Sequence, residues 1–179
     1  MNMHTIWQRQ VDSAGNSLVE TAIMLPILLA IAFNAINLGY FWFVGLSLAA
    51  APRLGVEYVS QGGAALATSS MPSTANVDAL VFDNLSNTLR ATSSNSATRV
   101  CSATSSGGVD STSHISACDS YGMSYSFGAN TADPEAPVFV LNRVDVAYTV
   151  TPIIKGTVFS VVLPSNRTFA RHVSMRSLY

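Results

Sequence analysis

Charged side chains are scarce in this chain of 179 residues: they make up 11% of it and leave a formal net charge of −1. Because binding to a phosphate backbone requires a concentration of Lys and Arg, this balance argues against nucleic acid as a partner. The scarcity is also local, since no charged residue occurs between Glu20 and Arg53. About 20 apolar residues already span the hydrocarbon core of a bilayer, so this stretch predicts a membrane-spanning helix.

The sequence also lacks the motifs of common catalytic and cofactor sites. Its three histidines, His4, His114 and His172, are scattered and form no HExxH pair, and no GxSxG, P-loop or GxGxxG motif occurs. Asp110 and Asp119 lack the dense oxygen-ligand spacing of a calcium loop. We therefore expect no catalytic residue, no cofactor and no metal site, and we predict an assembly subunit rather than an enzyme.

Cysteine is limited to two residues, Cys101 and Cys118, with no histidine or further cysteine placed to complete a zinc site. In an exported domain an even pair within a polar segment predicts a disulfide. Closing a loop of this length stabilises a fold by roughly 3 kcal/mol in the chain-entropy model. The alternative is two free thiols in a cytosolic protein, and the membrane segment upstream favours the disulfide.

The composition divides the chain into three parts. Residues 1–15 form a polar leader that we expect to be disordered or lightly structured, and a long helix for membrane spanning and assembly follows over 16–60. At 1.5 Å per residue such a helix extends roughly 60 Å, twice the hydrocarbon thickness, so it must project out of the membrane. Residues 61–179, richer in Ser, Thr, Ala, Asn and Gly, form a soluble head domain.

Within the helix, small and polar residues predict contact with other helices. Gly39 and Gly45 allow two helix backbones to approach closely, and amides at membrane depth, here Asn34 and Asn37, usually face another helix rather than lipid. Glu20 has two explanations that stay open. Either its carboxylate has a partner that offsets desolvation, or it completes a capping box with Ser17 at the start of the helix.

The head domain shows both periodicities. Apolar residues recur every three to four positions over Val77–Leu89, which predicts an amphipathic helix capped by Ser73 or Thr74. Residues 91–118 are Ser/Thr-rich and predict a loop or a short irregular hairpin that turns at Gly107-Gly108. Period-two alternation over 138–154 and again over 168–176 predicts half-buried strands, the last at a sheet edge. The fold class is therefore α+β, with a long N-terminal helix, one head helix and an antiparallel sheet.

Two other interpretations of the N-terminal region were weighed. A secretory signal cut near Ala49–Ala51 would be unusually long, because a normal apolar core has 7–15 residues. An uncleaved signal anchor is the stronger alternative. It would carry a periplasmic binding or adhesion domain with no filament role, or an anchored enzyme whose site no motif reveals.

The residues GNSLVETAIMLP over Gly15–Pro26 resemble the start of TadE/TadF-type minor pseudopilins of the tight-adherence (Flp, type IVb) pilus. In that family a small residue precedes the cleavage site, a glutamate is the fifth residue of the mature chain, and an apolar helix with a proline follows. The turn TPIIKG over Thr151–Gly156 and the last strand ending at Ser174–Arg176 are loosely similar to the family's C-terminal end.

The resemblance implies a pilin-like head and processing by a prepilin peptidase between Gly15 and Asn16. Glu20 would then be the fifth residue of the mature chain and pair with the N-terminal amine of its own or a neighbouring subunit. The implied partners are that peptidase, other pilins or pseudopilins, the pilus assembly platform and membrane lipid. The implied location is a single pass through a bacterial inner membrane, with the N-terminus cytoplasmic and the head periplasmic, or a pilus at the cell surface.

Overall fold

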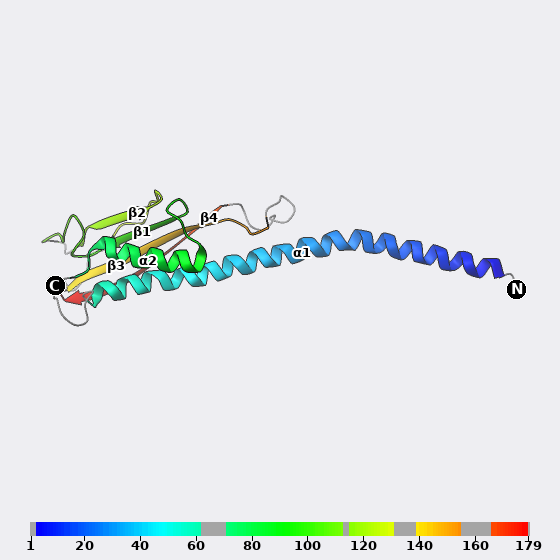
Figure 1. Cartoon of the computed structure of the whole chain (residues 1–179), viewed down its shortest axis with the longest axis horizontal. Coiled ribbons are helices and arrows are strands. Elements are labelled where there is room, and N and C mark those ends of the chain that lie inside the picture. Colours follow the sequence, from blue (N-terminus) through cyan, green and yellow to red (C-terminus); the bar gives the residue numbers. More distant parts are fainter. Residues whose placement is uncertain (1–2, 62–70, 113–114, 131–138, 155–165, 179) are drawn as a thin grey trace. The chain divides into compact units, whose positions relative to one another are not determined.

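The computed structural model describes residues 3–61, 71–112, 115–130, 139–154 and 166–178 (Figure 1). Two helices precede four strands in the described residues: α1 (Met3–Ser60), α2 (Thr74–Leu89), β1 (Ser96–Cys101), β2 (Cys118–Gly122), β3 (Phe139–Val150) and β4 (Arg167–Leu178). The predicted α+β class is confirmed. The chain forms two compact units, Met1–Tyr40 with Pro152–Ser165 and Phe41–Thr151 with Asn166–Tyr179, so the boundary falls within α1.

Helix α1 begins earlier than the sequence analysis predicts. Its backbone is helical from Met3, whereas residues 1–15 were expected to be disordered or lightly structured. The physical reason is that positions 3–14 contain neither Gly nor Pro, so polarity alone did not prevent a helix. Ser17 therefore lies inside α1, where its carbonyl accepts a hydrogen bond from the Thr21 hydroxyl at 2.9 Å. In the uncut chain Ser17 is therefore not the N-cap of α1, and the capping-box explanation of Glu20 does not hold there.

The second half of α1 forms one wall of the core in the larger unit. Its buried positions recur at three-to-four spacing and are Phe41, Val44, Leu48, Ala51, Val56 and Val59. The Phe41 ring meets Phe169 of β4 edge-on, with ring centroids 5.9 Å apart. Gly55 lies at the closest crossing, since a Cβ there would be 2.7 Å from a Val81 methyl of α2 and 3.3 Å from a Val144 methyl of β3.

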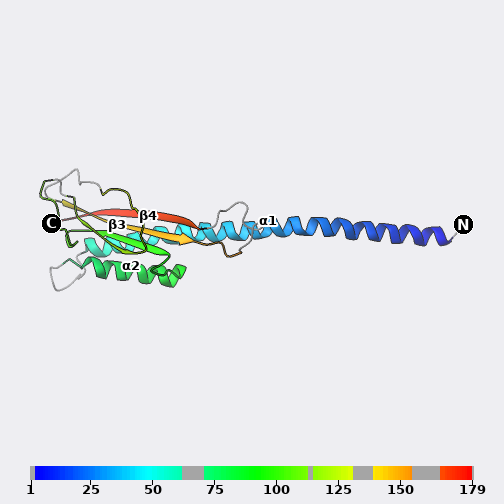
Figure 2. The same ribbon diagram turned by 90° about the horizontal axis from the view of Figure 1, so that it is seen from above.

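Helix α2 follows its predicted pattern closely. The Ser73 hydroxyl accepts a hydrogen bond from the Asn76 N–H at 3.3 Å, so Ser73 is the N-cap. The helix ends where Arg90 adopts a left-handed conformation (φ 55°) and the Tyr148 hydroxyl donates to the Leu89 carbonyl at 2.8 Å. The buried residues of α2 are Thr74, Val77, Val81, Leu85 and Leu89. In Figure 2, α2 runs beside the second half of α1.

The sheet has the strand order β2-β1-β3-β4, and every pairing is antiparallel. The predicted strand near the C-terminus is confirmed as the edge strand β4. Strand β1 was predicted only as loop or irregular hairpin, because its polar residues gave no apolar alternation. In the structure Ser96 and Thr98 are buried; Thr98 is paired with both β2 and β3, and Ser96 is paired with β3.

Strand β3 was predicted to be half-buried, and this is wrong. Its apolar residues Val144, Val146 and Val150 are buried, yet Arg143 and Asp145 on the alternate face are buried as well. Both faces are therefore covered, one by the helices and the other by residues 127–129, which contact Arg99 of β1 and Arg143 of β3. This burial of charge on the second face has to be explained by partners.

Candidate assembly surface and its support

The first half of α1 exposes most of its large apolar side chains, apart from one stripe around Asn34 and Asn37 that is partly or fully buried. Among the described residues of the smaller unit the exposed set comprises Leu18, Val19, Ile23, Met24, Leu25, Ile27, Leu28, Leu29, Ile31, Ile36 and Leu38. A helix that is apolar all round needs a core or a membrane to cover it. Ser17–Ser60 is the one described helix long and apolar enough to cross a membrane, and its most apolar 18-residue window is not buried. These observations indicate a membrane anchor.

Burial along α1 limits how much of it can face lipid. From Phe41 onward one face of the helix is used in the core of the larger unit. The part before it, Leu18–Tyr40, extends about 34 Å, which matches a hydrocarbon core about 30 Å thick. Tyr40 and the exposed Trp42 stand at the end of this part, as aromatic residues do at membrane interfaces. The expected projection of the helix beyond the membrane thus corresponds to its core-forming half.

Glu20 lies near the start of this apolar segment and is exposed. With Thr21, Met24, Leu25 and Leu28 it lines a shallow hollow of about 270 Å³ on the helix surface. Among the described residues, both ion pairs go to Asp145, so Glu20 has no cationic partner within that part of the chain. A carboxylate in such apolar surroundings is costly to desolvate unless a cation approaches it.

The two predicted packing amides differ in what they contact. Asn37 is fully buried, and its side chain makes two hydrogen bonds to the backbone of Ile154. The Asn37 Nδ2 donates to the Ile154 carbonyl at 3.2 Å, and the Asn37 Oδ1 accepts from the Ile154 N–H at 3.1 Å. Asn34 donates to the Ala30 carbonyl at 2.7 Å, but its buried Oδ1 has no hydrogen-bond partner among the described residues. Asn37 is thus engaged inside the chain, whereas the Asn34 Oδ1 is buried and unpaired among the described residues, and its use toward another helix stays a prediction.

The two predicted packing glycines lie at open positions. A Cβ built on Gly39 or on Gly45 would meet no atom within 4 Å. Among the described residues, therefore, no contact requires glycine at either position, in contrast to Gly55. Their use in packing against another helix stays a prediction, and the open surface leaves room for it.

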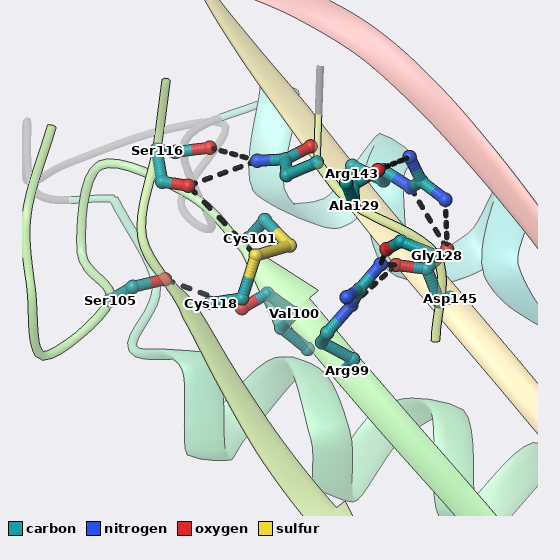
Figure 3. A network of polar contacts seen from close by, with 11 residues as sticks. Arg99, Val100, Cys101, Ser105, Ser116, Cys118, Gly128, Ala129, Arg143 and Asp145 are labelled. Atoms are coloured by element: carbon teal, nitrogen blue, oxygen red, sulfur yellow. Dashed lines mark hydrogen bonds and ion pairs between the residues drawn. A yellow bond between two sulfur atoms is a disulfide. The ribbon is translucent and has the colours of Figure 1, made fainter. Parts of the chain in front are cut away.

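The predicted disulfide is confirmed: Cys101 and Cys118 occupy paired positions of β1 and β2, with sulfur atoms 2.06 Å apart (Figure 3). It closes the 102–117 segment, which is held further by Asp119. That carboxylate accepts hydrogen bonds from the Thr74 hydroxyl at 2.7 Å and from the N–H and hydroxyl of Ser106. The Ser106 hydroxyl is the largest cause that lowers the pKa of Asp119 from its ordinary 3.8. A disulfide indicates a domain outside the cytoplasm.

A buried charge cluster, which the sequence pattern does not predict, lies beside the disulfide. Asp145 accepts from Arg99 at 2.8 Å and from Arg143 at 2.7 Å, as Figure 3 shows. The same arginines donate to the Gly128 and Ala129 carbonyls at 2.6 and 3.1 Å. Only the strand register places Arg99 opposite Asp145, so no linear spacing could reveal the cluster. Its hydrogen bonds are internal, and it fastens a loop to the sheet rather than forming an open site.

No group of three or more His, Cys, Asp or Glu side chains gathers in the described part of the chain as a metal site would require. No protein-family model, curated protein or solved structure matches this chain. The architecture itself is pilin-like. It consists of a long apolar N-terminal helix, a second helix and a four-stranded antiparallel sheet with a disulfide.

Proposed function

We propose that this chain is a membrane-anchored minor pseudopilin of the TadE/TadF type, which assembles with pilin-like subunits and is not an enzyme. The observation that carries the proposal is Glu20, exposed and without a cationic partner in the described residues at the start of an exposed apolar helix. A plain membrane anchor has no need of a carboxylate there. A subunit that docks beside other helices does need a carboxylate, because a carboxylate buried between helices requires a cation at one defined position on the neighbour.

Processing supplies the cation in this proposal. A prepilin peptidase that cuts between Gly15 and Asn16 creates a new α-amino group at residue 16, so that Glu20 becomes the fifth residue of the mature chain. The cut lies within the continuous helix α1, so the backbone must unwind locally for cleavage. Gly15 is suited to this, because glycine lowers helix stability by about 1 kcal/mol relative to alanine.

Assembly then follows from pairing and packing. The new amine of one subunit, or of the same subunit, pairs with the Glu20 carboxylate and offsets its desolvation. Such a pair selects the register between helices more than it adds net stability. Gly39 and Gly45 permit another helix to approach closely, because a Cβ at either position would meet no described atom within 4 Å. The disulfide-bonded head lies in the periplasm, and the subunit primes or caps a filament.

The first experiment is the intact mass and the N-terminal residue of the full chain, purified from membranes of a host that has a prepilin peptidase. We expect a start at Asn16 for the wild type and for Gly15→Ala, and an uncut chain for Gly15→Leu, whose side chain is too large for a site that takes a small residue. A wild type that retains Met1 would establish an uncleaved signal anchor instead. A start near Ala50 would establish a secreted domain.

The role of Glu20 is tested by co-purification with pilus components. We expect Glu20→Ala to insert into the membrane normally but to lose its pilus partners, because the neighbouring amine no longer finds a carboxylate. The matched control is Glu57→Ala, which makes the same change at an exposed position of the same helix and should keep the partners. Equal co-purification of both variants with pilus components would rule out the pairing role of Glu20.

A further inference from the structure

A second hollow lies on the head, between α2 and the two outer strands β1 and β2. It encloses about 160 Å³, room for several water molecules, and is lined in part by Asp78 and Phe82 of α2, Thr98 of β1, and Tyr121 and Gly122 of β2. The proposed pilus role uses none of these residues. The hollow belongs wholly to the larger unit, so its walls are fixed by the packing of α2 on the sheet.

Asp78 is the charged wall of this hollow. Its side chain is half-buried, and burial raises the pKa of the carboxyl above its ordinary 3.8, an effect that the Thr98 hydroxyl opposes by hydrogen bonding. Both ion pairs of the described residues involve Asp145, so no described cation neutralises Asp78. A carboxylate that is partly desolvated and faces an open hollow has bonding capacity for a cation from outside.

The other walls restrict what that cation can be. Phe82 and Tyr121 present aromatic rings, and the Tyr121 hydroxyl is held by Thr74 at 2.9 Å, which fixes its ring. Gly122 has a positive φ of 80°, and a side chain there would collide with the Ser96 carbonyl, so this wall stays bare. Aromatic rings beside a carboxylate attract an organic ammonium group, whose methylene stem also needs apolar contact. Ser93, Ser96 and Thr98 also line the hollow, and their hydroxyl oxygens can accept hydrogen bonds from the ammonium N–H groups.

We propose that the hollow formed by Asp78, Phe82 and Tyr121 binds a primary ammonium group carried on a short aliphatic chain. The Asp78 carboxylate accepts hydrogen bonds from the ammonium, and the two rings contact the methylene groups behind it. Two sources share this chemistry, the side chain of a lysine in a polypeptide and a free aliphatic diamine. The inference stands independently of the pilus role, since none of its residues lies in α1.

The test uses the full chain in detergent micelles, with backbone amide shifts of Thr98 and Gly122 followed during titration. The probes are Nα-acetyl-lysine amide and the neutral analogue Nα-acetyl-norleucine amide, which has the same stem without the charge. We expect saturable shifts with the lysine probe and binding weaker by about tenfold or more with the neutral one. Equal responses to both probes would overturn the proposal, and so would no response to either.

Variants assign the binding to the hollow. Asp78→Asn should weaken binding of the lysine probe by about tenfold or more, while Asp83→Asn, the same change at an exposed position of the same helix, should leave it unchanged. Phe82→Leu keeps an apolar side chain and should weaken binding less than Asp78→Asn does. Unchanged affinity in Asp78→Asn would contradict the proposal even if the other variants behaved as expected.

A third probe distinguishes the sources of the ammonium. Cadaverine has a similar stem but no peptide groups. If it binds as tightly as the lysine probe, the ligand is a free amine, because the peptide groups then contribute nothing. If it binds more weakly, the hollow recognises a lysine side chain together with its backbone. Either result is consistent with the ammonium site. In Asp78→Asn we expect binding of both cadaverine and the lysine probe to be lost.

Discussion

The two halves of α1 are similarly apolar in sequence but bury their side chains in different ways. Over Leu18–Leu38 most of the large apolar residues are exposed, while over Phe41–Val59 they divide into a buried face and an exposed face. The difference shows that an apolar sequence predicts that a helix is removed from water, but does not predict whether lipid or protein covers it. Lipid is expected to cover the first half, and the sheet and α2 cover one side of the second.

The largest expected effect is the difference in unfolding free energy between a substitution at a buried position of α1 and the same substitution at an exposed position. Leu48→Ala removes a fully buried side chain and should lower the free energy of unfolding of the head by about 2–5 kcal/mol. Leu28→Ala makes the same change at a position that is 64% exposed and should change that free energy by about 0.5 kcal/mol or less. Denaturant unfolding in detergent, followed by near-ultraviolet circular dichroism, measures both. Equal losses would show that the halves do not differ in this respect.

A charge scan locates the end of the lipid-facing part. Ile31→Lys places an ammonium within the proposed span and should oppose membrane insertion by about 2.5–3.5 kcal/mol. Leu46→Lys, also at an exposed position, lies beyond that span and should leave insertion unchanged. The inserted fraction in an in vitro translocation assay measures both variants. If Leu46→Lys were impaired as strongly as Ile31→Lys, the membrane boundary would lie further along the helix.

The smallest effect concerns two glycines of the second half. Gly55→Ala should lower the free energy of unfolding of the head by about 1–3 kcal/mol, because the added methyl group would collide with the Val81 and Val144 side chains. Gly45→Ala meets nothing within 4 Å and should stabilise the helix by up to about 1 kcal/mol. Thermal unfolding measures the pair. A Gly45→Ala variant that keeps its stability but loses pilus partners would assign Gly45 to packing between subunits.

Local patterns were sufficient for part of this fold. The three-to-four spacing of Val77, Val81 and Leu85 and the cap at Ser73 predicted α2, and alternation predicted β3 and β4. The charge-free run predicted the anchor. In each case the deciding contacts lie within a few residues of one another or repeat along one element.

Other features depend on distant residues and could not be predicted. Strand β1 gains its burial from neighbours on both sides, so Ser96 and Thr98 resembled a loop. The Arg99–Asp145 pair needs the register between β1 and β3. Glu20 and Gly15 were identified from a motif and not from geometry, so their roles stay predictions until the chain's N-terminus is determined.

The contact between Asn37 and Ile154 has a consequence for biosynthesis. The two residues are 117 positions apart, so the Asn37 amide enters the helix long before the backbone that satisfies it exists. At 5–20 residues per second, translation alone imposes a wait of about 6–23 s. During that interval the side-chain amide of residue 37 lacks the backbone partner that it has in the folded chain. A protein of the translocation machinery that binds the new helix could therefore hydrogen-bond to this amide. Completion of the head then removes that signal by its own folding.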